Sequence, residues 1–202
     1  MSDTDDVTPE TPKSAPADRA TNGPLDESEA NPVRPYVDLG GVKFVPRSDL
    51  GVRLEVEEAS KRVVAVSLDY AGSTLQVQPF AAPRSSGLWL EIRAQIAAQV
   101  AKQGGSVEEA DGPLGPELRA ELPAQDGSTQ IVRFVGVDGP RWFLRGMIGG
   151  KGAADPEAAA QVEELFRSIV VVRGSTPMPP RDLIPLHVPA SAQAAPGAPR
   201  RG

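Results

Sequence analysis

Residues 131–148 read IVRFVGVDGPRWFLRGMI, and this stretch carries the main structural signal of the chain. Two runs rich in β-branched and aromatic residues flank Asp138-Gly139, a dipeptide that favours tight hairpin turns. The pattern predicts two antiparallel strands joined by a two-residue turn, which would set Val135 opposite Trp142. We expect this hairpin to lie at the centre of a sheet.

Alternation along the two strands places apolar side chains on both faces of the hairpin. One face carries Ile131, Val135, Val137, Trp142, Leu144 and Ile148, and the other carries Val132, Phe134, Phe143 and Met147. A sheet with one face in water does not need two apolar faces. The sequence therefore predicts an α+β fold, in which an antiparallel sheet has a helix packed on each face as an α/β/α sandwich.

The flanking sequence supplies the other elements of such a fold. Alternating apolar residues predict strands, and apolar residues at steps of three and four predict helices. A capping serine at Ser85-Ser86 and a closing Gly104-Gly105 bound the first helix, and Asp155-Pro156 begins the second. The expected strands are a short edge strand at 36–45, a meander over 52–57, 63–70 and 74–80, then 107–110 and 117–122, with 170–172 as extended chain.

The distribution of proline divides the chain into three parts. Of 21 prolines, 13 lie in residues 1–35 and 174–202, which leaves eight for the 138 residues between. Residues 1–35 also carry eight acidic and three basic side chains with few large apolar ones, a composition typical of disorder. We expect a disordered acidic arm over 1–35, a single α+β domain over 36–173, and a proline-rich extended or disordered tail over 174–202. The tail would lie along a groove of its own domain or dock on another protein, and we favour the first.

Several kinds of chemistry lack the residues they need. The chain has no cysteine, and its one histidine, His187, lies in a proline-rich segment without neighbours to orient it as a general base. The glycines before Lys151 miss the spacing of a phosphate-binding loop, which needs four residues between its first glycine and the Gly-Lys pair. We therefore expect no catalytic residues, no metal site and no cofactor.

Composition also bears on location and on partners. The absence of cysteine fits a reducing compartment, and no apolar run has the roughly 18 residues that predict a membrane span. The sequence carries no basic region followed by an apolar run, so no secretory signal is expected. We expect a cytoplasmic protein that does not cross a membrane. A net charge of −6 argues against nucleic acid as the partner, because phosphate contacts dominate such binding.

Three arginines in or beside the hairpin are the candidate binding residues. Arg133 and Arg145 lie among apolar neighbours on strands expected to be central, and Arg141 follows the turn. A buried arginine needs a carboxylate or carbonyl partner. The structural interpretation, which we favour, is that Arg133 and Arg145 extend outward at a sheet end or pair with glutamates. The functional interpretation is that all three present charge to an acidic partner or ligand, and the acidic arm of the chain itself is one candidate.

Several of these segments resemble a known family. The chain is similar, over about residues 23–189, to the actinobacterial family called domain of unknown function 3710. The resemblance is carried by Gly87-Leu88-Trp89, Gly136 to Gly146, Asp155-Pro156, Val171 to Gly174 and Pro177 to Arg181. The family has no established activity, so the resemblance implies a lineage and a cytosolic setting without a mechanism. The order of elements is also similar to that of Mog1/PsbP-like sandwiches.

These observations leave the molecular function open and favour one class. We expect a non-catalytic protein-interaction or scaffolding domain whose partner is another protein. The alternative is a small-molecule binding protein or enzyme with a pocket between sheet and helix, in which Arg133 or Arg145 holds an anion. A nucleic-acid-associated accessory protein is the third candidate, and the sequence leaves the oligomeric state open.

Overall fold

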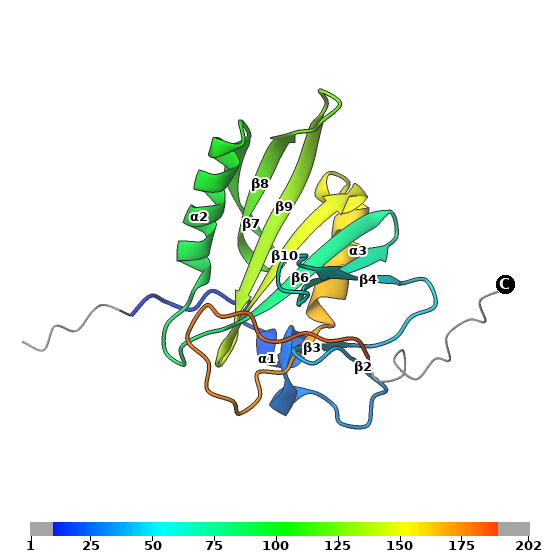
Figure 1. The fold of residues 1–202 in the computed structure, drawn as a ribbon, viewed down its shortest axis with the longest axis vertical. Helices are drawn as coiled ribbons and strands as arrows, with labels where there is room; N and C mark the ends of the chain where they lie inside the picture. The colour runs from blue at the N-terminus through cyan, green and yellow to red at the C-terminus, as the bar shows by residue number, and fades with distance from the viewer. Residues whose placement is uncertain (1–9, 190–202) are drawn as a thin grey trace, which may run out of the picture.

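The computed structural model describes residues 10–189 and contains one large and one small sheet (Figure 1). The large sheet has seven strands in the order β4-β5-β6-β10-β9-β8-β7, and every neighbouring pair is antiparallel. Its strands are β4 (Gly51–Val56), β5 (Val63–Tyr70), β6 (Ser73–Ala81), β7 (Ser106–Gly112), β8 (Gly115–Pro123), β9 (Thr129–Asp138) and β10 (Trp142–Gly150). The expected α+β class is confirmed, and the strands agree with the expected ranges to within a few residues.

The small sheet joins segments that are distant in sequence. It has the order β1-β11-β3-β2 and consists of β1 (Leu25–Asp26), β2 (Val37–Asp38), β3 (Val42–Phe44) and β11 (Val170–Val171). Pairing of β1 with β11 is parallel, and the other two pairs are antiparallel. The edge strand expected over 36–45 is therefore two short strands around Gly40-Gly41, and they belong to this second sheet.

The hairpin of β9 and β10 lies at the centre of the large sheet, but its register differs from the expected one. Asp138 pairs with Phe143 and Val137 with Leu144, so Trp142 does not lie opposite Val135. The connection is residues 139–142, and the amide of Gly139 donates to the carbonyl of Trp142 within it. The displacement is an even number of residues, which leaves every side chain on the expected face.

The helix α2 (Trp89–Lys102) packs on the Phe134 and Phe143 side of the hairpin. Its first residue stacks on the sheet, with 5.6 Å between the ring centroids of Trp89 and Phe143. A side chain at Gly136 would clash with Trp89, so the glycine permits this close approach. The capping serine expected at Ser85-Ser86 is wrong, because no side chain caps the helix at its N-cap residue and the carboxylate of Asp138 accepts from the nearby amide of Leu88.

The helix α3 (Pro156–Arg167) packs with the Val135, Leu144 and Ile148 side of the hairpin. Its N-cap is Asp155, whose side chain accepts a hydrogen bond from the amide of Ala158, as the sequence predicts. A short 3-10 helix, η2 (Lys151–Ala153), leads into it from β10. No helix among residues 10–189 is long and apolar enough to cross a membrane.

Residues 10–35 are part of the folded unit, in contrast to the disordered arm expected over 1–35. They contain α1 (Arg19–Asn22), β1 and the 3-10 helix η1 (Glu27–Glu29). The guanidinium of Arg19 donates to both carboxylate oxygens of Glu29, and the indole of Trp142 donates to Asp26. Acidic composition suggested disorder, yet these acids have partners on the domain. Residues 1–9 lie outside the described part.

The tail from residue 174 to 189 lies on its own domain, which agrees with the interpretation we favoured. Its main chain bonds to the end of β6. The amide of Ala81 in β6 donates to the carbonyl of Asp182, and the amide of Ile184 donates to the carbonyl of Pro79 in β6. In this part of β6 the partner strand β5 has ended, since their pairing covers only residues 73–77 of β6. Ile184 and Leu186 join the core. Residues 190–202 of the expected tail lie outside the described part.

Candidate functional site

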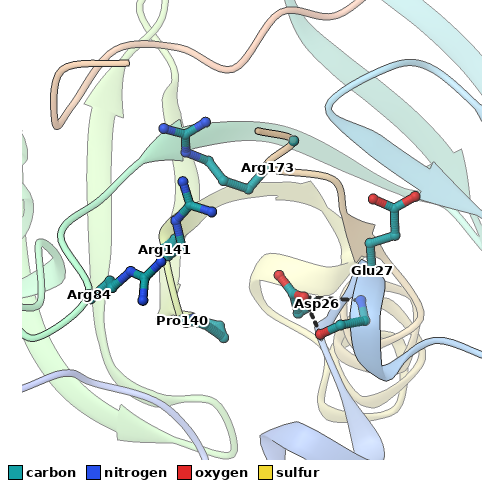
Figure 2. A pocket seen from close by; sticks show the side chains of 8 residues that line it. Asp26, Glu27, Arg84, Pro140, Arg141 and Arg173 are labelled. Carbon is teal, nitrogen blue, oxygen red and sulfur yellow. Dashed lines mark hydrogen bonds between the residues drawn. The ribbon is translucent and has the colours of Figure 1, made fainter. Parts of the chain in front are cut away.

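A cleft of about 640 Å³ lies where the connection between β9 and β10 meets residues 26–28, Arg84 and residues 173–174. Its lining residues are Asp26, Glu27, Ser28, Arg84, Pro140, Arg141, Arg173 and Gly174. Figure 2 shows the three arginines along one side of the opening and the two acids along the other. We call this feature the arginine cleft.

Each arginine of the cleft comes from a different segment of the chain. Arg84 lies in the connection between β6 and α2, Arg141 in the connection between β9 and β10, and Arg173 follows β11. The amide of Ala82 donates to the carbonyl of Arg141 over 3.0 Å, which ties the first two connections together. The guanidinium of Arg173 donates to the carbonyl of Thr176 over 2.8 Å. A main-chain hydrogen bond therefore holds the connections of Arg84 and Arg141 together, while the side chain of Arg173 is held by its own segment.

The two acids of the cleft are already engaged by other groups. Asp26 accepts hydrogen bonds from Ser28 and, over 2.9 Å, from the indole of Trp142. Burial acts to raise the pKa of Asp26, but these bonds and the charge of Arg19 outweigh it, and the pKa lies below its usual value. Glu27 forms an ion pair with Lys43 at 3.2 Å. Neither acid is paired with a cleft arginine.

The cations of the cleft lack counter-ions. Among residues 10–189, the side chains of Arg84 and Arg141 have no ion pair or hydrogen bond, and Arg173 has no carboxylate partner. Partial burial and the nearby charge of Arg141 both lower the pKa of Arg173 below its usual value. The Nε atom of Arg173 is buried without a partner. The three guanidiniums therefore gather on one side of the cleft with no carboxylate among residues 10–189 bound to them, an arrangement suited to an anion.

Of the arginines singled out in the sequence, Arg133 has a structural role. It is 4% exposed and donates to both oxygens of Glu117, which is 1% exposed, to Glu163 at 2.5 Å and to the carbonyl of Gly152. Burial acts to lower the pKa of Arg133, but the two glutamates outweigh it and raise the pKa. Two glutamates therefore neutralise Arg133, and four of its five N–H donors bond to groups of the protein.

Arg145 lies apart from both Arg133 and the arginine cleft. Its guanidinium lies 5.4 Å from the ring centroid of Phe134 on the side of the sheet that α2 covers. The structure thus separates the three sequence candidates into a core ion pair, a cleft residue and a residue beneath a helix. Only Arg141 belongs to the arginine cleft.

Sequence reasoning missed Arg84 and Arg173 as members of the cleft. They are 57 and 32 residues from Arg141 in the chain, and each follows a strand. For Arg173 the available signal was its place in the Val171 to Gly174 segment that carries the family resemblance. Among residues 10–189 no three His, Cys, Asp or Glu side chains are grouped as they would be to hold a metal ion. His187 is exposed and its amide donates to the carbonyl of Leu39.

Comparison with known proteins identifies the lineage of the chain. The model of the family described as proteins of unknown function, DUF3710, matches residues 23–195. The match covers most of the sequence, and the chain belongs to this family, as the sequence resemblance indicated. A search of curated proteins found no match. The similarity to Mog1/PsbP-like sandwiches stays a prediction.

Proposed function

We propose that this member of the DUF3710 family is a non-catalytic protein-interaction domain, and that the arginine cleft binds an acidic segment of a partner protein. One observation carries the proposal: three guanidiniums line a single cleft with no carboxylate partner among residues 10–189, while Asp26 accepts from the indole of Trp142 and Glu27 pairs with Lys43. The three guanidiniums are exposed or only partly buried, so a carboxylate from a partner can bind them without displacing another acid. We also infer a cytoplasmic location, since the absence of cysteine fits a reducing compartment.

Carboxylates are the groups that suit this cleft. A guanidinium binds a carboxylate through two parallel hydrogen bonds, so three arginines can engage successive acidic side chains of one segment. Pro140 and Gly174 at the rim present little bulk to hinder an extended chain. The cleft is open to solvent, which suits a peptide that enters from outside. A long polyanion such as nucleic acid would be repelled by the net charge of −6 on the whole chain.

The proposal treats the domain as a sandwich with α2 on one face and α3 on the other. Two separate apolar clusters support this arrangement. One contains Trp89, Ile96 and Val100 of α2 together with Phe143, and the other contains Val162, Leu165 and Phe166 of α3 together with Leu144. In this arrangement the helices cover both faces of the sheet, so a partner protein would bind at an end of the sheet, where the arginine cleft lies.

A defined probe tests the proposal on the full chain. A fluorescein-labelled hexaglutamate peptide is titrated with the protein, and binding is followed by fluorescence anisotropy at low and at physiological salt. The double variant Arg84→Gln/Arg141→Gln removes two charges whose side chains have no partner within the described residues, so the fold is retained. We expect it to weaken binding about tenfold or more.

The matched control is Arg34→Gln/Arg62→Gln, which makes the same change of net charge at two arginines outside the cleft. It should leave the affinity for the peptide within about twofold. Equal losses from both double variants would mean that the peptide responds to overall charge, and the proposal would fail. Tighter binding of a single-stranded oligonucleotide of equal charge would also overturn it.

A small anionic metabolite is the second candidate for the same cleft. The observation in its favour is the volume of about 640 Å³, which lies within the range of small-molecule sites. A thermal-shift screen with citrate and with ATP separates the two candidates, because a ligand that binds only the folded state raises the unfolding temperature. A shift with either anion that disappears in Arg84→Gln/Arg141→Gln, without binding of the peptide, would support the metabolite instead.

A further inference from the structure

A second cavity, of about 380 Å³, lies between α2 and the large sheet, away from the arginine cleft. Its lining residues are Ile92, Gln95, Ile96, Gln99, Gln103, Leu122, Phe134, Arg145 and Met147. The apolar members come from α2 and from the three neighbouring strands β8, β9 and β10, so the cavity has an apolar floor. We call it the helix–sheet cavity.

Arg145 is the only charged residue in this lining. Burial lowers the pKa of Arg145 below its usual value, and no acid acts in the opposite direction. Within residues 10–189 the side chain has no ion pair and no hydrogen bond, only the contact with the ring of Phe134. Arg145 is partly buried and its guanidinium has no carboxylate partner among residues 10–189, so an anion can bind it directly.

Arg133 provides the comparison within the same sheet. It lies on β9, beside β10, and is more deeply buried than Arg145, but two glutamates neutralise it and its Nη1 donates to the carbonyl of Gly152. The fold thus supplies Arg133 with counter-ions. Arg145 has none within residues 10–189, although it lines a cavity that is large enough for a ligand.

The side of α2 that lines the cavity carries amides at its margin. Gln95, Gln99 and Gln103 recur at steps of four residues, which aligns them along one stripe of the helix. All three are exposed and, within the described part of the chain, their side chains have no hydrogen bond. Ile92 and Ile96, in contrast, are at least half-buried against the sheet. The cavity thus combines an apolar floor, one cation and a rim of amide donors.

We infer that the helix–sheet cavity binds a monocarboxylate with an apolar tail, a compound of the medium-chain fatty acid class. The guanidinium of Arg145 binds the carboxylate, and amides of the glutamine rim donate further hydrogen bonds to it. The tail lies against Ile96, Leu122 and Met147. One guanidinium matches one negative charge, so a single carboxylate fits the site better than a polyanion. This site is independent of the acidic segment proposed for the arginine cleft.

The test uses the full chain and decanoate, kept below its micelle concentration, with decanol as the uncharged probe. Isothermal titration calorimetry and thermal shift are recorded for the wild type and for Arg145→Gln. We expect decanoate to raise the unfolding temperature of the wild type and to bind about tenfold to a hundredfold more weakly to the variant, because a charge-assisted hydrogen bond is lost. Decanol should bind the wild type and the variant equally weakly.

Two further variants keep the result interpretable. Gln99→Trp adds bulk at an exposed rim position, where the fold is not at risk, and should also weaken decanoate binding. Arg34→Gln removes a charge outside both the arginine cleft and the helix–sheet cavity and should leave decanoate binding unchanged. The inference fails if decanoate does not bind the wild type, if decanol binds as tightly, or if Arg145→Gln and Gln99→Trp both retain wild-type affinity. Binding of the hexaglutamate peptide should be unaffected by Arg145→Gln, which keeps the two proposals distinguishable.

Discussion

At the scale of single residues, Asp138 has more partners than a turn residue requires. Its carboxylate accepts from the amide of Ser14 at 2.9 Å and from the amide of Leu88 at 2.8 Å, so it joins the N-terminal segment, the hairpin and the start of α2. The side chain is 3% exposed. Burial raises the pKa of Asp138, although these hydrogen bonds and the charge of Lys13 act in the other direction.

Because the pKa of Asp138 is higher in the folded chain than the ordinary value of 3.8, its protonated form is favoured by folding. This contribution to stability is complete below pH 3.8 and is lost as the pH rises through the folded pKa. Asp138→Asn removes the titration. We expect the unfolding temperature of the wild type, relative to that of the variant, to fall as the pH is raised from below 3.8 to neutral.

Differential scanning fluorimetry of both proteins across this pH range gives the measurement. A tenfold difference in proton affinity between the folded and unfolded chain corresponds to about 1.4 kcal/mol, which is large enough to detect. If the unfolding temperature of the wild type instead rises relative to that of the variant as the pH is raised, the hydrogen bonds to Asp138 outweigh its burial. Asp69→Asn is a control that should respond in the opposite direction, since hydrogen bonds from Arg53 and Thr74 lower the pKa of that exposed carboxylate. The unfolding temperature of the wild type, relative to that of Asp69→Asn, should rise as the pH is raised.

At the scale of secondary-structure elements, the tail acts as an added strand segment. Residues 181–184 bond to the part of β6 that β5 leaves unpaired, and Ile184 is 3% exposed in the core. Ile184→Ala should lower the free energy of unfolding by about 2–4 kcal/mol, because it removes buried methyl groups and leaves a cavity. Urea denaturation followed by tryptophan fluorescence measures the change.

Ile131→Ala provides the matched control for the tail. The same chemical change is made on β9 at a residue that is 44% exposed, so the expected loss is below about 1 kcal/mol. If the two variants lose equal stability, Ile184 does not contribute a core contact and the tail is not docked in solution.

The hairpin shows which features of an element local pattern can predict. Alternation of apolar residues indicated both faces of β9 and β10 correctly, because side-chain direction depends only on the parity of position along a strand. The register was wrong, because the dipeptide Asp138-Gly139 favours a two-residue turn. Hydrogen bonds from Ser14 and Leu88 to Asp138 hold the start of this connection in another conformation. Those donors are far away in sequence.

At the scale of the whole molecule, the folded unit extends beyond the domain that composition indicates. The strand β1 pairs with β11, and the amide of Leu25 donates to the carbonyl of Ile169. Arg19 lies over the ring of Trp142, with 5.6 Å from its guanidinium to the ring centroid. These contacts join residues near the start of the chain to the central hairpin and to the end of α3.

A chain that begins at Tyr36 should therefore unfold at a much lower temperature than one that begins at Glu10. The shorter form loses β1, the hydrogen bond to the indole of Trp142 and one wall of the arginine cleft. Circular dichroism and tryptophan fluorescence during heating measure the difference. Equal unfolding temperatures for the two forms would show that the domain boundary expected from proline content is the correct one.

The sequence by itself determined the α+β class, both long helices, the two apolar faces of the hairpin and the lack of cysteine chemistry. These features depend on residue type and on spacing along the chain, which are local. Only the tertiary structure decided that Glu117 and Glu163 neutralise Arg133, that Arg145 has no counter-ion within residues 10–189, and that Arg84, Arg141 and Arg173 share one cleft. The physical reason is that counter-ions and backbone partners are chosen by proximity in space, and composition does not indicate which distant segments will meet.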